Sequence, residues 1–189
     1  MIDADESDEL NDDSLGFSLI NASFAIAIMK VPVPVSTEPN VPPPQPTDLR
    51  TWTGLKATAE SVEFVGVEGM IVSAQDLYVA INQCGGGIKT NPTDPDFTTV
   101  NTTVVDFKAA PLKVNTGGGN SINLDFAGAD GKLLQAAGHL TIGMFDYFYM
   151  SGDFAFVKKT ETVTLYDTAN KTNTPNVKVD LLTVGAQGV

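Results

Sequence analysis

Residues 131–159, GKLLQAAGHLTIGMFDYFYMSGDFAFVKK, decide the fold class of this chain. Large side chains recur there at every second position in two sets of opposite parity: Leu140, Ile142, Met144, Phe148 and Met150, and then Phe145, Tyr147 and Tyr149. A period of two is typical of an extended strand, because successive side chains of a strand point to opposite faces. We therefore expect a long aromatic-rich strand that runs to about residue 150, a turn at residues 151–153 and a second strand over residues 154–158.

Composition and turn signals favour further strands on both sides of this ribbon. The chain of 189 residues holds 17 glycines and 18% charged residues, a balance that suits strands and turns. The pattern predicts a hairpin turn at residues 128–131 and further strands at 55–59, 62–67, 70–82, 99–114, 121–126, 161–166 and 177–184. We expect an all-β domain over residues 15–189 that is elongated and has mostly antiparallel, sandwich-like sheets. A long curved single sheet is the alternative.

The segment before the proline-rich residues 31–46 has a pattern of its own. Large Phe24, Ile26 and Ile28 alternate with small Ser23, Ala25 and Ala27. This alternation predicts a strand that packs on both of its sides. The prolines that follow predict an extended connector, since each one biases its predecessor away from the helical region.

Acidic residues dominate the charge of the chain. Residues 1–14, MIDADESDELNDDS, contain no basic residue, and we expect them to form a solvated, disordered tail. The formal net charge of the whole chain is -12 at pH 7. Phosphate groups would be repelled by this charge, so the sequence argues against nucleic acid and anionic membrane surfaces as partners.

The sequence also bears on export and on the membrane. The N-terminus lacks the basic region of a cleavable signal peptide. No apolar run approaches the ~20 residues that span a bilayer, so we expect no membrane insertion. Cys84 is the single cysteine, which excludes an intrachain disulfide. Either the protein is cytosolic, or its export uses another signal, or this chain is a piece of something longer.

Two internal matches indicate a repeat. Residues 21–26 resemble residues 151–156, and residues 182–189 resemble residues 55–62, with a separation of about 130 residues in both cases. The matches predict one complete unit and part of a second copy that begins near residue 142. The final strand would then lack a neighbour, and an open edge of this kind is a template for another chain.

These segments also suggest a family. The Phe-Ala-Phe motif at residues 154–156, the Leu-Thr-Val-Gly-Ala motif at residues 182–186 and the acidic Gly/Thr/Asn-rich loops resemble repeat units of very large secreted bacterial surface proteins of the adhesin type. The resemblance implies an extracellular or cell-surface location, attachment or fibre formation, neighbouring repeats as partners, and calcium. The Gly-Gly-x-Gly-x-Asp nonapeptide of the best-known calcium repeats does not occur in the sequence.

Catalytic residue patterns are weak in this sequence. His139 is the only histidine, and Asp146 and Cys84 are the partners that a catalytic site would recruit. The flank of His139 lacks a nucleophile-elbow signature, and a zinc site would need more His or Cys ligands. Asp146 with Asp153 is one nominal carboxylate pair for glycoside cleavage. We expect a non-enzymatic structural or adhesive module that assembles end to end.

Two binding hypotheses remain beside the structural one. Phe145, Tyr147 and Tyr149 share a parity and could line a carbohydrate- or lipid-binding face of the aromatic strand. Oxygen ligands in two loops could hold Ca²⁺, and the residues concerned are Asp94, Asp96, Asp125 and Asp130. The alternative for these carboxylates is a turn-forming role, in which an aspartate bonds its own backbone.

Overall fold

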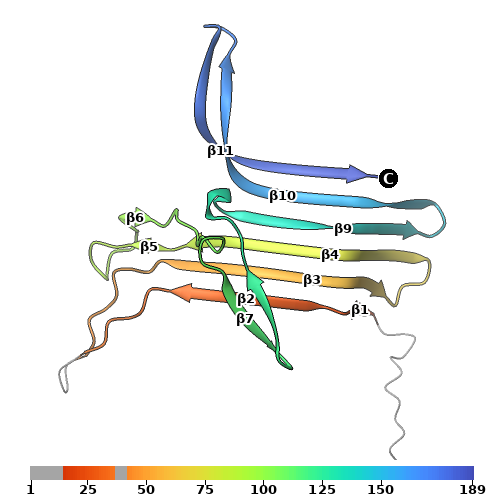
Figure 1. Ribbon diagram of the computed structural model, residues 1–189, viewed down its shortest axis with the longest axis horizontal. Helices are drawn as coiled ribbons and strands as arrows, with labels where there is room; N and C mark the ends of the chain where they lie inside the picture. Colours follow the sequence, from red (N-terminus) through yellow and green to blue (C-terminus); the bar gives the residue numbers. More distant parts are fainter. Residues whose placement is uncertain (1–14, 37–41) are drawn as a thin grey trace, which may run out of the picture.

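A computed structural model describes residues 15–36 and 42–189 and shows one large antiparallel sheet (Figure 1). The strand order is β1-β3-β4-β9-β10-β11, and β2 pairs with the other half of β3. The strands are β1 Gly16–Ile20, β2 Ser23–Lys30, β3 Thr51–Val65, β4 Met70–Gly85, β9 Leu133–Met144, β10 Phe148–Asp167 and β11 Thr172–Gln187. The predicted all-β, mostly antiparallel fold is confirmed. The predicted tail, residues 1–14, lies outside the described residues.

Two small hairpins accompany the large sheet. They pair β5 Gly87–Ile88 with β6 Thr99–Val100, and β7 Leu112–Gly117 with β8 Asn120–Leu124. The β7–β8 hairpin crosses one face of the sheet and contacts β2 and β3 (Figure 1). The second layer of the expected sandwich is therefore this hairpin and the segment that leads into it, and together they cover part of one face.

The buried core lies under the β7–β8 hairpin. Phe107 and Leu124 are almost completely buried, and Phe107 packs edge-on against Phe126 with ring centroids 6.0 Å apart. The sheet offers small residues beneath them: a Cβ at Gly54 would lie 2.8 Å from the Phe107 ring. Ala80 is also fully buried. We call the sheet face that carries Gly54 and Ala80 the covered face, and the opposite face the bare face.

Polar side chains anchor the irregular segment above this core. Buried Asn82 donates from Nδ2 to the carbonyl of Val105 at 2.8 Å. Buried Asn101 donates to the carbonyl of Thr51, and its Oδ1 accepts from the Thr103 hydroxyl at 2.8 Å. A segment without strand partners needs such bonds, because buried backbone carbonyls without a partner are costly. The predicted strand pair over residues 99–114 is accordingly wrong: only β6 and the start of β7 fall within it.

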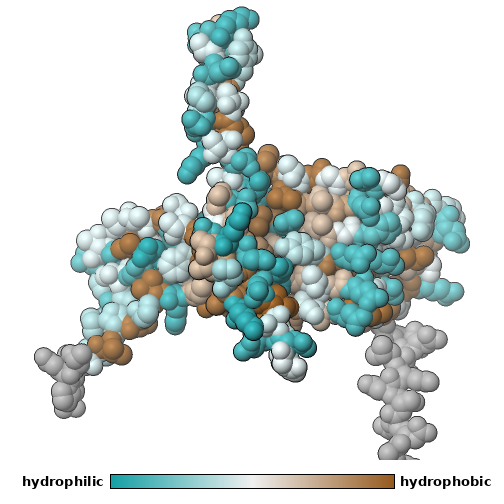
Figure 2. Space-filling view, viewed as in Figure 1, coloured by the Kyte–Doolittle hydropathy of each residue, from teal (hydrophilic) through white to brown (hydrophobic). Residues whose placement is uncertain are grey.

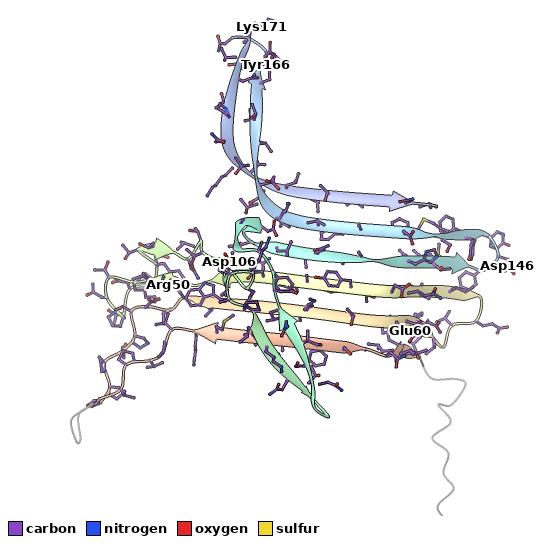
Figure 3. All side chains as sticks on the ribbon, viewed as in Figure 1. Arg50, Glu60, Asp106, Asp146, Tyr166 and Lys171 are labelled. Carbon is purple, nitrogen blue, oxygen red and sulfur yellow. The ribbon has the colours of Figure 1, made fainter. Side chains whose placement is uncertain are left out.

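The aromatic stretch forms a turn, not one strand. Phe145 and Asp146 have φ angles of 48° and 60°, and the Tyr147 N–H donates to the Met144 carbonyl at 2.9 Å. Two positive φ angles are typical of the tight turns that join antiparallel strands. β9 and β10 therefore meet at residues 145–147, at one end of the sheet (Figure 3). The predicted continuous strand to about residue 150 and the predicted turn at residues 151–153 are both wrong.

Two other local predictions are corrected. Residues 128–131 do not join paired strands: Gly128–Asp130 is a short 3-10 turn, η1, and the strands beside it pair elsewhere, β8 with β7 and β9 with β4. The Asp106 carboxylate holds this turn by accepting from the Gly128 N–H at 2.9 Å. The predicted strands 55–59 and 62–67 are one strand, β3, with a local irregularity near residue 60.

The last two strands extend beyond the sheet. β10 pairs with β9 only as far as Lys158, whereas its pairing with β11 continues to Asp167. Residues 159–181 therefore form a two-stranded arm that projects from the sheet, with Tyr166 and Lys171 near its tip (Figure 3). At its base the Lys159 ammonium lies 2.7 Å from the Glu161 carboxylate and 3.7 Å from that of Asp130.

Candidate interaction surface

The bare face of the sheet is apolar over most of its area. Residues paired across antiparallel strands point to the same face, so the register assigns each residue to one side. One such row runs through Phe24, Ala57, Val79, Ala136 and Phe156. The neighbouring rows are mostly apolar, with pairs such as Phe17–Phe64, Leu19–Val62, Ile26–Leu55 and Ile142–Met150. The row of Ile26 and Leu55 ends at Lys158, near the base of the arm.

This face has no cover among the described residues, because the buried core and the β7–β8 hairpin lie on the other side. Phe24 is 65% exposed, Ile28 76% and Val184 70%. A central depression of about 190 Å³ is lined by Ala74, Ala136, Gly138, Leu140, Phe154 and Phe156. Exposed apolar areas of this extent mark interaction sites in soluble proteins.

The covered face is polar where the hairpin does not reach it. The register places four polar residues on this side of the sheet: Glu63, Ser73, His139 and Asp153. Figure 2 shows this side with hydrophilic side chains distributed over the sheet and over the arm. The strands in this part of the sheet therefore alternate between apolar residues on the bare face and polar residues on the covered face. In antiparallel sheets such alternation normally accompanies an apolar face that is packed against another layer.

A hydrogen-bonded cluster on the covered face has the connectivity of a catalytic triad. His139 Nδ1 lies 2.9 Å from Asp153 Oδ1, and His139 Nε2 lies 2.9 Å from Ser151 Oγ, which lies 2.9 Å from Thr141 Oγ1. From sequence, Asp146 and Cys84 are the expected partners of His139, whereas in the structure its partners are Asp153 and Ser151. The hairpin register brings these residues together, since His139 is opposite Asp153 and Thr141 is opposite Ser151.

The surroundings of this cluster are open to water. The side chain of Asp153 is 71% exposed and that of His139 is 40% exposed. Catalytic electrostatics depend on a water-excluded site with donors aimed at the developing charge. The arrangement can tie β9 to β10 through side-chain hydrogen bonds, and it offers an exposed polar patch next to Asp76 and Gln187.

The predicted aromatic ligand face lies at the β9–β10 turn. Phe145, Tyr147 and Tyr149 are exposed, with Tyr147 at 95%. Tyr147 and Tyr149 line an open depression of about 430 Å³ together with Ile71 and Met144. The Phe145 N–H donates to the Gly69 carbonyl at 2.6 Å, which ties this turn to the adjacent β3–β4 turn. Solvent-exposed aromatic rings at a fixed turn are able to stack on a sugar or an apolar group.

The predicted calcium ligands have protein partners. Lys56 Nζ lies 3.0 Å from the Asp125 carboxylate, and Asp130 faces Lys159 at the base of the arm. Asp94 accepts from the Asn91 backbone N–H at 2.8 Å, as in a turn-forming aspartate. Within residues 15–36 and 42–189, no cluster of three or more acidic, histidine or cysteine side chains is arranged to hold a metal ion. Calcium binding by these four aspartates, Asp96 included, stays a prediction.

The glycine triplet at residues 85–87 serves packing. A Cβ at Gly86 would lie 2.0 Å from the Leu49 carbonyl oxygen, and one at Gly87 would lie 2.3 Å from the Thr99 carbonyl oxygen. Gly86 also has a positive φ of 68°. Close approach of backbone carbonyls requires glycine at both positions.

Both edges of the sheet are open in the described part of the chain. β1 and β2 pair only with β3, and β11 pairs only with β10. Residues 16–29 and the flat portion of β11, residues 182–187, contain no charged residue and no proline. Natural edge strands are normally protected against pairing by lysine, proline or bulges. Within these residues the two edges lack the first two devices, and the lysine of the β2 edge, Lys30, lies at the end of the strand.

No family model, curated protein or solved structure matches this chain. A search of the described residues for a helix that is long and apolar enough to cross a bilayer finds none. The features of the described structure that bear on function are the two edges, the bare face and the exposed aromatic turn.

Proposed function

We propose that this chain is a non-enzymatic structural module of an extended β assembly, in which the β11 edge of one copy pairs with the β1–β2 edge of the next. The uncharged, open edges at both sides of the sheet carry this proposal. In the setting that the adhesin-type resemblance implies, the module is exported and acts in a fibre at the cell surface.

Strand direction supports the same arrangement. Every neighbouring pair from β1 to β11 is antiparallel, and the path contains six strands, so β1 and β11 run in opposite directions. A second copy displaced within the plane of the sheet would therefore present its β1 antiparallel to β11. The new pair would continue the hydrogen-bonding pattern of the sheet without a change of polarity.

Proline substitutions in β11 test this pairing. The N–H groups of adjacent residues in an edge strand point alternately to its partner and to the open side. Of Thr183→Pro and Val184→Pro, one removes a bond to β10 and the other removes only an outward donor. We expect the variant that leaves the melting temperature unchanged to lose assembly in sedimentation velocity and electron microscopy. Assembly at the wild-type level in that variant would refute edge pairing.

A second function is favoured by the exposed aromatic turn. Tyr147 and Tyr149 border an open depression and have the geometry of a sugar-stacking surface. Glycan-array binding by the full chain tests it, with Tyr147→Ala as the variant and Tyr166→Ala on the arm as the matched control. Selective loss of glycan binding in Tyr147→Ala is the expected result. Equal binding by both variants, or no binding by the wild-type chain, would contradict a carbohydrate site at this turn.

A further inference from the structure

The sheet lacks a second layer on its bare face. Stable domains bury the apolar side of a sheet against another layer of structure. Here the layer formed by Phe107, Leu124 and the β7–β8 hairpin lies on the covered face. The bare face keeps Phe24, Ile28 and Val184 mostly exposed.

We propose that the bare faces of two copies pack against each other and form a two-sheet sandwich. Such a contact is isologous: the same patch is used on both copies, and a two-fold axis relates them. It is separate from edge pairing, which extends a sheet within its own plane. The two contacts together would give a double-layered fibre, and each can be tested without the other.

The size of the bare face matches what a stable dimer needs. The part of the face from the β1–β2 edge to β9 is four strands wide, and at about 4.8 Å spacing and about 12 residues of about 3.3 Å rise it gives roughly 760 Å² of sheet per copy. A standard specific interface buries about 800 Å² per partner. A patch of this size and apolar character is adequate for a homodimer.

The relief of the face is self-complementary. Phe24 protrudes at the β2 edge, and it lies in the same cross-strand row as Ala136 in β9. Ala136 lines the central depression with Gly138 and Ala74. A two-fold axis parallel to the strands, placed between β3 and β4, lays β2 of each copy over β9 of the other. Residues of one row stay at one height, so Phe24 of each copy enters the depression at Ala136 of the other.

The distribution of charge permits this contact. The register places Glu63 and Asp153 on the covered face, and the cross-strand pairs of the bare face contain no carboxylate. Among the described residues, these carboxylates of the sheet thus lie away from the proposed interface. Repulsion between two copies is weaker when their acidic groups point outward from the pair.

Two matched substitutions on one strand test the proposal. Phe24→Asp puts a charge on the bare face, and Ser23→Asp puts the same charge on the covered face of β2. Sedimentation equilibrium of the full chain at about 0.15 M salt, where charge repulsion is screened, should give a dimer for wild type and Ser23→Asp. Phe24→Asp should weaken the dimer at least about tenfold, since an unpaired charge is costly to bury. Circular dichroism should show unchanged strand content in both variants.

Cross-linking tests the geometry independently of folding effects. In a Cys84→Ser background, Phe24→Cys with Ala136→Cys should give a covalent dimer with a short bismaleimide. Ser23→Cys with Ala137→Cys, on the covered face, should not. A wild-type monomer at all concentrations, or equal cross-linking of both pairs, would overturn the proposal. So would a monomer that floats with neutral phosphatidylcholine vesicles, since lipid would then cover the bare face. Loss of filaments in a proline edge variant with the dimer retained would separate the two contacts.

Discussion

Small residues decide where the second layer can sit. Gly54 lies on the covered face under Phe107 and Leu124, and its missing side chain makes room for both. Ala80 and Ala25 continue this low surface on the neighbouring strands, and both are buried. On β2 the large Phe24, Ile26 and Ile28 point to the bare face, whereas Met29 and Tyr78 of β4 pack against the core on the covered face. The expected two-sided packing of residues 23–28 is therefore only half right, because the structure buries the small side and leaves the large one exposed.

Gly54→Ala should lower the free energy of unfolding by about 1–3 kcal/mol, the usual cost of overpacking a filled core. The new Cβ would lie 2.8 Å from the Phe107 ring and 3.0 Å from Leu124. Gly185→Ala is the matched control, because a Cβ there meets nothing within 4 Å. Urea denaturation measures both. Equal stability of the two variants would show that the segment above Gly54 is not packed as described.

At the scale of elements, alternation predicts strands well and turns poorly. Met144 and Phe148 are opposite one another across a three-residue loop, so they share both a face and a parity. A loop of odd length leaves the period of two unbroken, and the sequence pattern therefore runs through the turn. The same effect explains why the sequence did not reveal the hydrogen-bonded cluster around His139. Once the centre of the β9–β10 turn is known, the pairing of His139 with Asp153 follows directly. Near residue 60 the pattern misleads in the opposite way. An irregularity there shifts the parity within one continuous strand, so the sequence predicts two strands in place of one.

Asp106 is an element-scale contact with a pH signature. Its carboxylate accepts from the backbone N–H groups of Gly128 and Ala109, and these bonds hold the pKa of Asp106 below its ordinary value. The ionised form is thus favoured by folding. The resulting stability is fully present above the unfolded pKa of about 4 and is lost as the pH falls through the lowered folded pKa.

Asp106→Asn should therefore reduce stability at pH 7 and flatten the decline of stability in acid. Thermal unfolding between pH 7 and pH 2 measures this, with Asp146→Asn in the exposed β9–β10 turn as control. Asparagine tolerates the positive φ of that position, so the control should follow the wild-type curve. A parallel decline in Asp106→Asn and wild type would mean that the η1 turn is not held by this carboxylate.

At the scale of the whole molecule, the chain combines a sheet that has an apolar bare face and open edges with a net negative charge that repels other copies. The edges and the bare face follow from register, which a sequence without known turn positions does not reveal. The bare face in particular is split between odd and even positions by the irregularity in β3 and β4. The predicted repeat and the acidic composition also belong to this scale, because both affect how one copy of the chain associates with another.

Assembly should therefore depend on ionic strength. The net charge of -12 opposes the approach of two copies, and salt shortens the reach of this repulsion from about 30 Å at 0.01 M to about 8 Å at 0.15 M. We expect the mean mass in light scattering to rise with protein concentration and with NaCl over this range. MgCl₂ at equal ionic strength should act similarly if screening is the cause, whereas an effect confined to CaCl₂ would indicate a specific calcium site.

The β11 proline variant that leaves the melting temperature unchanged should remove filament growth at every salt concentration while a dimer persists. A chain that stays monomeric across salt and concentration would contradict both contacts, because neither the open edges nor the bare face would then have a partner in a second copy.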